Sequence, residues 1–120
     1  MNGLDIIDYD GRGYKPAMAF EAWRVAFLNY DTHFDKIMKL ERHMETDEVF
    51  MLLEGEATLI IGLEKTLVPM EKHKIYNVKK GVWHATVMSE DAKFLIVENH
   101  NTSAENSEKI FYNPPLKVEL

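Results

Sequence analysis

Short stretches in which apolar and polar residues alternate run through most of the chain after residue 22. In residues 36–43, Met38 and Leu40 alternate with charged neighbours, and this period of two predicts a β-strand. Similar short segments, rich in aromatic or β-branched residues, occur at 23–30, 48–53, 56–62, 67–70, 74–78, 82–88 and 94–98. No segment has a long run of apolar residues at helical spacing. Many short strands separated by turn residues predict an all-β sandwich or barrel.

The pattern divides the chain into an arm, one domain and a tail. Residues 1–22 contain Gly3, Gly11 and Gly13, and predict an N-terminal arm with turns. Residues 23–113 are expected to form one folding unit, and residues 114–120, which begin with two prolines, an extended tail. A chain of 120 residues can bury enough surface to fold without a metal ion or a disulfide. Any bound metal would therefore serve function rather than folding.

Two features of the central strands bear on topology and assembly. Because Glu54 and Gly55 separate residues 48–53 from residues 56–62, we expect these two strands to form a hairpin that turns near the glycine. Residues 49–53 are apolar at every position, which predicts a strand covered on both faces, by the core and by a second copy of the chain. The polar segment 99–109 is expected to be a surface loop.

Charge and composition exclude several classes of function. The chain has 14 Lys and Arg against 20 Asp and Glu, a formal charge of -6, and its basic residues are scattered. This argues against a nucleic-acid-binding domain and against binding to an anionic membrane surface. The longest apolar run is far shorter than a membrane span, and the N-terminus lacks the basic and apolar regions of a signal peptide. Since there is also no cysteine, we expect a soluble protein in the reducing cytoplasm.

Four side chains could carry chemistry. On an extended strand Glu41 and His43 project from the same face, and Glu48 begins the following strand. His84 follows Gly81, which permits a tight entry into another strand. If these segments meet inside a barrel, two imidazoles and two carboxylates form a ligand set suited to a divalent Fe, Mn, Ni or Zn ion.

Taken singly, each of these residues has a simpler interpretation. His43 alone would be a turn histidine, and His84 alone a hydrogen-bonded core histidine. Glu41 could form a salt bridge with Lys39 or Arg42 at the edge of the sheet. The aromatic residues of the strands are expected mainly in the core, namely Phe50, Tyr76, Trp83 and Phe94.

The joint spacing of these residues resembles the two motifs of the cupin superfamily. His43, four residues, Glu48, six residues and Gly55 match the first motif, with Glu41 at the position of its first histidine. Gly81 and His84 match the second motif. The resemblance covers residues 36–99 and implies a cupin jelly-roll barrel, a double-stranded β-helix that commonly forms homodimers. It also implies that the metal ligands are Glu41, His43, Glu48 and His84.

A narrower similarity is to the ureidoglycolate lyase branch of the cupins. It rests on residues 40–43, Phe50, residues 55–56 and residues 82–84. In that branch a glutamate precedes the histidine as Glu41 precedes His43, and the enzymes split ureidoglycolate into glyoxylate and urea. If the similarity extends to chemistry, Glu48 and His84 are the pair expected to move the proton.

Three functional hypotheses follow from the sequence. The first is a metal-dependent enzyme that acts on a small polar metabolite in the barrel, with the lyase reaction as its narrower form. The second is a small-molecule binding protein without catalysis, because a barrel with a pocket binds ligands in either case. The third is a metal-free isomerase-type cupin that uses His43 and a carboxylate as an acid–base pair.

Overall fold

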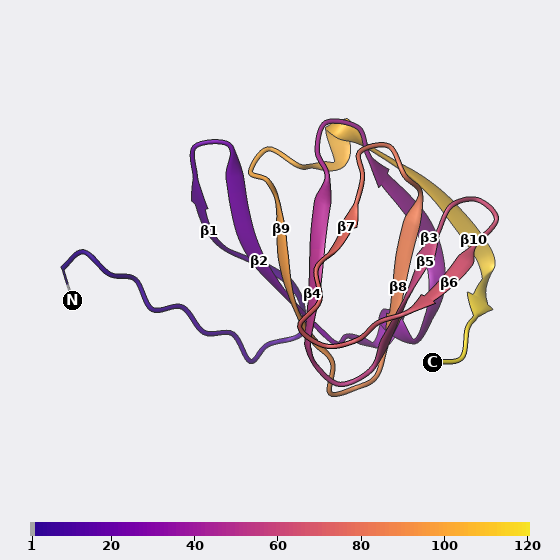
Figure 1. Ribbon diagram of the computed structural model, residues 1–120. Coiled ribbons are helices and arrows are strands. Elements are labelled where there is room, and N and C mark those ends of the chain that lie inside the picture. Colours follow the sequence, from indigo (N-terminus) through magenta and orange to yellow (C-terminus); the bar gives the residue numbers. More distant parts are fainter. Residues whose placement is uncertain (1) are drawn as a thin grey trace.

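The computed structural model describes residues 2–120 and contains two five-stranded antiparallel sheets that face each other (Figure 1). The first sheet has the order β1 (Gly13–Phe20), β2 (Trp23–Asn29), β9 (Lys93–Asn99), β4 (Glu48–Glu54) and β7 (Tyr76–Val78). The second has the order β10 (Ser107–Lys117), β3 (Lys36–His43), β8 (His84–Met88), β5 (Ala57–Ile61) and β6 (Thr66–Pro69). The helical segments of the described chain are the 3-10 turns η1 (Thr32–Asp35) and η2 (Ala104–Asn106). The all-β jelly roll predicted from the sequence is confirmed.

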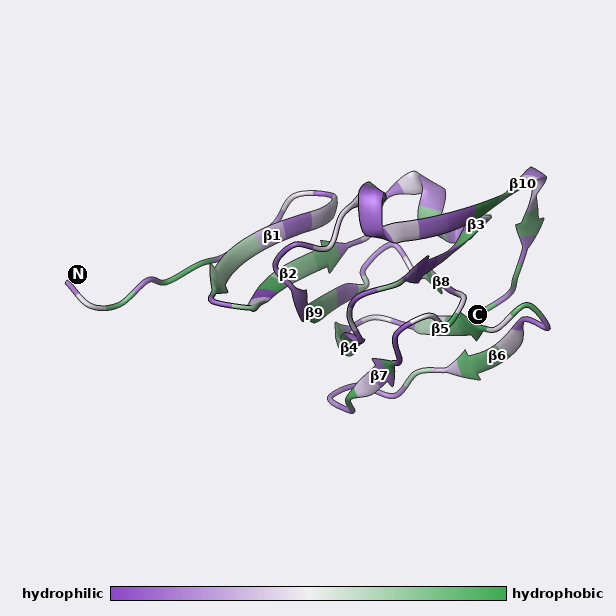
Figure 2. Ribbon diagram, turned by 90° about the horizontal axis from the view of Figure 1, so that it is seen from above, coloured by the Kyte–Doolittle hydropathy of each residue, from purple (hydrophilic) through white to green (hydrophobic). Residues whose placement is uncertain are grey.

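Alternation along the strands decides which side chains enter the space between the sheets. In β9 the buried residues Phe94, Ile96 and Glu98 alternate with the half-buried Leu95 and Val97. Seen from above, the two sheets form layers, with β2, β9 and β4 on one side and β3, β8 and β5 on the other (Figure 2). The main core fills part of the space between these layers, and its largest buried side chains are Phe50, Leu52, Leu59, Met88, Phe94 and Ile96.

A second apolar cluster involves the C-terminal part of the chain. Ile37, Leu40, Ile60 and Val87 are buried in it, and Tyr112, Leu116 and Val118 pack against them. Residues 107–109 and 114–117 thus belong to β10, where the sequence predicts loop and tail. The strand pairs with β3 in two pieces that are separated by an irregular stretch with two prolines, which hides its pattern in the sequence.

The expected hairpin around Gly55 is wrong. β4 pairs with β7 and β9, whereas β5 pairs with β6 and β8, so the chain crosses at Gly55 from the first sheet to the second. A tight glycine turn serves either connection, and long-range pairing decides between them. β4 and β5 are both inner strands, and each needs a partner on both sides. A hairpin between them would have given each strand only one of its two partners.

The N-terminal region is more ordered than an arm of 22 residues. Residues 13–20 form β1, which pairs with β2 along its length with a bulge between Pro16 and Met18. β1 is an edge strand whose side chains are mostly exposed, so it lacks the alternation that marks the inner strands. Of residues 2–12, the part nearest to β1 lies against the first sheet, since Asn29 Nδ2 donates to the Tyr9 and Gly11 carbonyl oxygens and the Tyr9 ring stacks on Phe27. The preceding residues 2–8 form an extended segment that points away from the barrel (Figure 1).

Substitution of Gly55 by alanine tests the crossing between the sheets. Gly55 has φ +79°, and an added Cβ would lie 2.7 Å from Ala92 Cα. We expect the free energy of unfolding to fall by at least about 2 kcal/mol, because the left-handed backbone costs about 1–2 kcal/mol and the clash adds to it. Equilibrium urea unfolding measures the change.

Gly81 provides the matched control. Its φ is +81°, but an added Cβ would meet nothing within 4 Å, so Gly81→Ala incurs the backbone cost alone. If both substitutions destabilise the protein equally, the close approach of residue 55 to Ala92 is not what constrains the crossing.

No helix of the described residues is long and apolar enough to cross a membrane.

Candidate metal centre

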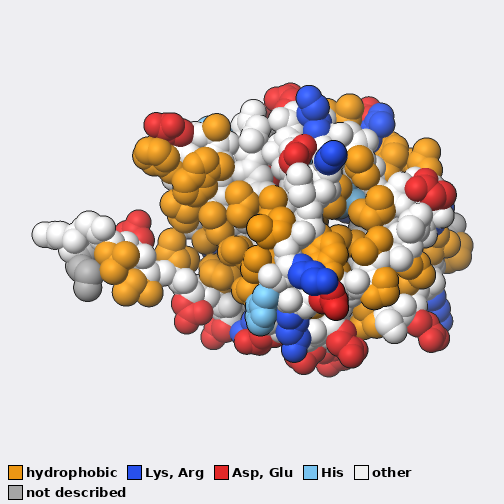
Figure 3. All heavy atoms as spheres, viewed as in Figure 1, with side chains coloured by type: hydrophobic (Ala, Val, Ile, Leu, Met, Phe, Trp, Pro, Cys, Tyr) orange, Lys and Arg blue, Asp and Glu red, His pale blue; other side chains and the backbone are white. Residues whose placement is uncertain are grey.

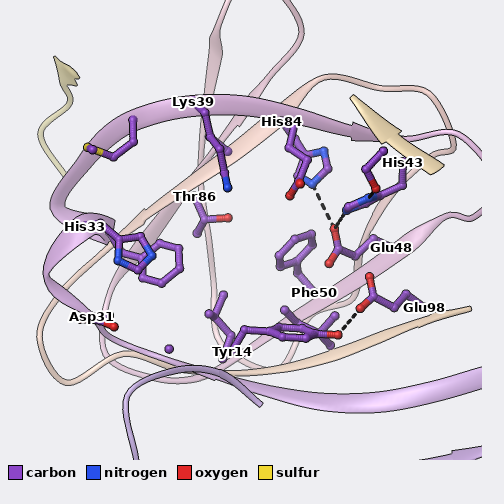
Figure 4. Close-up of a pocket in the computed structure, with 18 of the residues that line it drawn as sticks. Tyr14, Asp31, His33, Lys39, His43, Glu48, Phe50, His84, Thr86 and Glu98 are labelled. Atoms are coloured by element: carbon purple, nitrogen blue, oxygen red, sulfur yellow. Dashed lines mark hydrogen bonds and ion pairs between the residues drawn. The ribbon is translucent and has the colours of Figure 1, made fainter. Parts of the chain in front are cut away.

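A cavity of about 610 Å³ lies between the two sheets (Figure 4). This volume falls within the range of about 300–1,000 Å³ in which small-molecule sites occur. The inner faces of both sheets supply its charged and aromatic lining, including Arg24, Lys39, His43, Glu48, Phe50, His84 and Glu98. The space is therefore of a size and polarity that suit a small polar ligand.

Three of the residues predicted from the sequence meet at one side of this cavity (Figure 4). His43 ends β3, Glu48 begins β4 and His84 begins β8. Glu48 Oε1 lies 3.1 Å from His43 Nε2 and 3.0 Å from His84 Nε2. The residues are buried, with exposed fractions of 8%, 6% and 6% for His43, Glu48 and His84.

Two loops bring these strand ends together. The Asp47 carboxylate accepts hydrogen bonds from the Lys80 backbone N–H at 2.8 Å and from Asn77 Nδ2 at 3.0 Å. The Gly81 backbone N–H donates to the His43 carbonyl at 2.8 Å. The loop that leads to His84 is thus bonded to the segment that joins β3 and β4.

Hydrogen bonds to the Nδ1 atoms orient both imidazole rings. His84 Nδ1 lies 3.0 Å from the Val82 carbonyl oxygen. Because a carbonyl only accepts, Nδ1 carries a proton and donates it to Val82. His84 Nε2 and the Glu48 carboxylate face each other, and a proton or a cation must lie between them. His43 Nδ1 lies 2.7 Å from Ser107 Oγ. Both rings are held with Nε2 toward Glu48.

Burial and charge act in opposite directions on the pKa values of these groups. Burial raises the pKa of the Glu48 carboxyl, but the hydrogen bonds from the two histidines outweigh it and hold that pKa well below its usual range. Burial lowers the pKa of His43, whereas the hydrogen bond and the negative charge of Glu48 raise it, with smaller contributions from Glu41 and Glu98. The net effect is a His43 pKa above the ordinary value of 6.5.

The donor set fits a divalent transition metal ion. Two imidazole nitrogens and one carboxylate form the combination that binds such ions while leaving coordination positions open. Donor atoms that each lie about 2.1 Å from one ion at right angles are about 3.0 Å apart. The two N–O separations of 3.0 and 3.1 Å match this requirement.

Glu41 is not part of this group. Its carboxylate lies on the cavity side of β3, and its Oε2 is 3.7 Å from Lys109 Nζ. The sequence predicts Lys39 or Arg42 as its partner if it forms a salt bridge. Arg42 instead pairs with Glu108 and lies over the Trp83 ring at 4.5 Å.

We expect the metal affinity to fall as the pH is lowered through the pKa of His43, which lies above 6.5. A proton and the metal ion compete for His43 Nε2. Below the pKa of His43, the metal affinity therefore falls about tenfold for each unit by which the pH is lowered. Competition titration of Zn²⁺ against a chelating dye between about pH 5 and 8 measures it. An affinity that stays constant over this range would contradict the assignment of His43 as a ligand.

In the metal-free protein, pH acts on stability through the same two groups. The raised pKa of His43 contributes stability that is complete below the unfolded value of 6.5 and is lost as the pH rises through the folded pKa. The lowered pKa of Glu48 contributes stability above the unfolded value of 4.5, which is lost as the pH falls through the folded pKa. In chelator, these two groups should thus stabilise the fold most between 4.5 and 6.5. Thermal melting that improves steadily above this window would be inconsistent with the ion pair.

The sequence interpretation missed a second polar cluster in the cavity. Tyr14, Arg24 and Glu98 come from β1, β2 and β9, and all three line the cavity. The Glu98 side chain is only 2% exposed. An acidic residue at an inward position, two residues after Ile96 in a strand of period two, was the available signal.

No family model and no curated protein matches the chain. Solved structures do match. A cupin-2 domain protein from Shewanella frigidimarina aligns with a TM-score of 0.62 and 18% identity, covering 77% of this chain and 85% of that one. KdgF from Halomonas aligns with a TM-score of 0.60 and 10% identity, covering 77% and 81%.

Another similar structure is Streptomyces Pac13, described as a nucleoside dehydratase. It aligns with a TM-score of 0.65 and 6% identity, covering 87% of this chain and 83% of that one. At these identities the likeness establishes the fold. Together with the motif residues on β3, β4 and β8, it identifies the chain as a protein of the cupin fold.

Proposed function

We propose that the chain is a metal-dependent enzyme that acts on a small polar metabolite in the cavity between the sheets. His43, Glu48 and His84 would hold a divalent Fe, Mn, Ni or Zn ion. The observation that carries this proposal is the orientation of His84, whose Nδ1 is committed to Val82 while its buried Nε2 faces a carboxylate 3.0 Å away. A cation at this position satisfies both the imidazole lone pair and the carboxylate.

A bound ion of this kind supplies Lewis-acid polarisation of a substrate oxygen. The chain's own residues position the substrate and move protons. Glu48 and His84 are the pair that we propose for proton transfer when no ion occupies His84 Nε2. With an ion bound there and Nδ1 held by Val82, both nitrogens of His84 are engaged, and the proton transfer falls to Glu48. Because Glu48 Oε1 is occupied by both histidines, transfer by Glu48 uses Oε2, the other carboxylate oxygen.

Elemental analysis of protein purified without added ions tests the proposal. We expect about one equivalent of a transition metal per chain, or stoichiometric binding at micromolar concentration when a metal is supplied. Protein that holds no transition metal and binds none at that concentration would rule out a metalloenzyme.

A second candidate is a metal-free acid–base enzyme. It is favoured by the His43–Glu48 ion pair, in which the imidazole has a raised pKa and the carboxyl a lowered one. One similar structure is described as a nucleoside dehydratase, and dehydration is a reaction that acid–base groups can catalyse. Enzymatic activity that survives complete chelation of metal would favour this candidate. Ligand binding without turnover would instead favour a non-catalytic binding protein.

The narrower proposal is ureidoglycolate lyase activity. It rests on the sequence similarity around Glu41, His43 and His84. Release of glyoxylate from ureidoglycolate, measured with the metal-loaded protein, decides it. An absence of glyoxylate above the rate of the His84→Ala variant would remove this substrate.

We also propose that the chain forms a homodimer through the outer face of the first sheet. Val25, Val97 and Val49 lie in one row across β2, β9 and β4, and Phe27, Leu95 and Met51 lie in the next row. Hydrophobic side chains gather over β2 and β9 in Figure 3. The N-terminal segment carries exposed Leu4, Ile6 and Ile7 away from its own barrel, within reach of a second copy.

We also propose a cytoplasmic location for the protein, since the chain has no cysteine.

Light scattering coupled to size exclusion measures the mass in solution. We expect twice the chain mass for the wild type and a single chain mass for Val97→Lys, because a lysine cannot be buried unpaired in an apolar interface. Leu67→Lys is the control, since Leu67 is 51% exposed on the other sheet. A monomeric wild type would contradict the proposed dimer.

A further inference from the structure

Tyr14, Arg24 and Glu98 form a rigid cluster in the cavity, separate from the His43–Glu48–His84 group. Glu98 Oε2 accepts hydrogen bonds from the Tyr14 hydroxyl and from Arg24 Nη2 at 2.9 Å (Figure 4). Arg24 also donates to the carbonyl oxygens of His100 and Thr102 at 3.0 and 3.2 Å. The guanidinium is therefore fixed in place, and its charge balances that of Glu98.

The other carboxylate oxygen of Glu98 is left to the cavity. Among residues 2–120, no donor forms a hydrogen bond with Glu98 Oε1, although the side chain is only 2% exposed. No fully buried side-chain oxygen of the described residues lacks a hydrogen-bond partner, so Oε1 borders the open space of the cavity, where a ligand can donate to it. Because Arg24 already balances the charge, Oε1 favours a neutral hydroxyl over an ammonium group.

A cation without a carboxylate partner among the described residues lies elsewhere in the same cavity. Along the ladder of β3 and β10, Glu41 faces Lys109 and Lys39 faces Phe111. The carboxylate of Glu41 pairs with Lys109, whereas Lys39 forms no salt bridge within the described part of the chain. The one aromatic contact of its Nζ is with the exposed Phe111 ring, at 6.0 Å from the ring centroid. Lys39 lines the cavity, and Figure 4 shows its side chain directed toward Thr86. An ammonium group that has no carboxylate to balance its charge attracts an anion.

We propose that the cavity binds a small anionic hydroxy compound, with Glu98 Oε1 accepting a hydrogen bond from a substrate hydroxyl and Lys39 binding a carboxylate or phosphate. Arg12 and Lys36 also line the cavity, as do the carboxylates of Asp31 and Glu48, and Lys36 is paired with Asp35, so Lys39 is the cation on which the anion site depends. This inference concerns ligand binding alone, and any reaction of the bound ligand rests on the proposed function. It names the substrate class that the lining of the cavity recognises.

Binding of four probes to the ¹⁵N-labelled protein tests the inference by NMR titration. Gluconate and glucose 6-phosphate each carry an anion and hydroxyls, glucose lacks the anion, and adipate lacks the hydroxyls. We expect at least one of the first two to bind at least about tenfold more tightly than glucose and adipate, with shifts at Lys39, Thr86 and Glu98. The comparison of gluconate with glucose 6-phosphate distinguishes a carboxylate ligand from a phosphate ligand.

Two substitutions assign the two contacts. Lys39→Met is expected to weaken the anionic probe about tenfold without changing the affinity for glucose, and Glu98→Gln to weaken it by a similar factor. Lys72→Met is the matched control, because Lys72 is an exposed loop residue outside the cavity. If Glu98→Gln does not give a folded spectrum, Glu98→Asp retains the charge, shortens the side chain, and is expected to give the same loss.

Two results would overturn the inference. One is that none of the four probes binds, and the other is that glucose or adipate binds as tightly as the anionic hydroxy compounds. A Zn²⁺ titration of the same sample distinguishes failure of this inference from failure of the proposed metalloenzyme. Metal binding without probe binding overturns the inference alone, and probe binding without metal binding leaves the inference standing and removes the metalloenzyme.

Discussion

Replacement of His84 by alanine is expected to lower the affinity for a divalent transition metal ion by at least about 100-fold, with the fold retained. Loss of a residue that merely orients a metal ligand costs about 10–100-fold, and loss of a ligand costs at least as much. His84 Nε2 is one of only two imidazole nitrogens that face Glu48 among the described residues. Competition titration with Zn²⁺ measures the affinity, and far-ultraviolet circular dichroism checks the fold.

His100→Ala is the matched control for this prediction. His100 is an exposed loop histidine, and its contact with Arg24 uses the backbone carbonyl rather than the ring. We expect the control to bind metal as the wild type does. Unchanged metal affinity in the His84 variant would show that the ion, if bound, lies elsewhere.

Replacement of Phe94 by alanine is expected to lower the free energy of unfolding by about 3–5 kcal/mol. Phe94 is fully buried at 0% exposure. Its ring packs edge-on against the Phe50 ring, with 6.3 Å between the two ring centroids. The centroids of the Phe50 and His84 rings are 5.9 Å apart, so the core packs directly against the candidate metal site. Equilibrium urea unfolding of the metal-free protein measures the loss.

Phe111→Ala removes the same side chain from an exposed position. Phe111 is 70% exposed on β10, and we expect a change within about 0.5 kcal/mol. If the two alanine variants were equally stable, the space around Phe94 would not be the core on which both sheets pack.

Local pattern was sufficient for most strands. Residues 36–43 were predicted as a strand and form β3 with the same bounds. Both faces of this strand have a buried position, Leu40 on one and Ile37 and His43 on the other, whereas Met38, part of the predicted alternation, is exposed. β1 was not predicted, since an exposed edge strand has no reason to alternate. The connection at Gly55 could not be inferred either, because a turn residue reports local backbone geometry and not which strands pair across the barrel.

The site shows the same division between local and long-range information. His43, Glu48 and His84 were predicted because their spacing forms a motif, although 36 residues separate Glu48 from His84. Tyr14, Arg24 and Glu98 form a cluster through partners 74 and 84 residues apart, and no spacing in the sequence links them. Glu41 was placed on the correct face of β3, but its partner Lys109 lies on a segment that the sequence suggested was a loop.

Anomalous diffraction from a crystal soaked in Mn²⁺ or Zn²⁺ tests the metal centre most directly. We predict one strong anomalous peak inside the barrel, within about 2.0–2.2 Å of His43 Nε2, His84 Nε2 and a Glu48 oxygen. A cavity without a peak at saturating metal, or a peak bound only by surface carboxylates, would contradict the account.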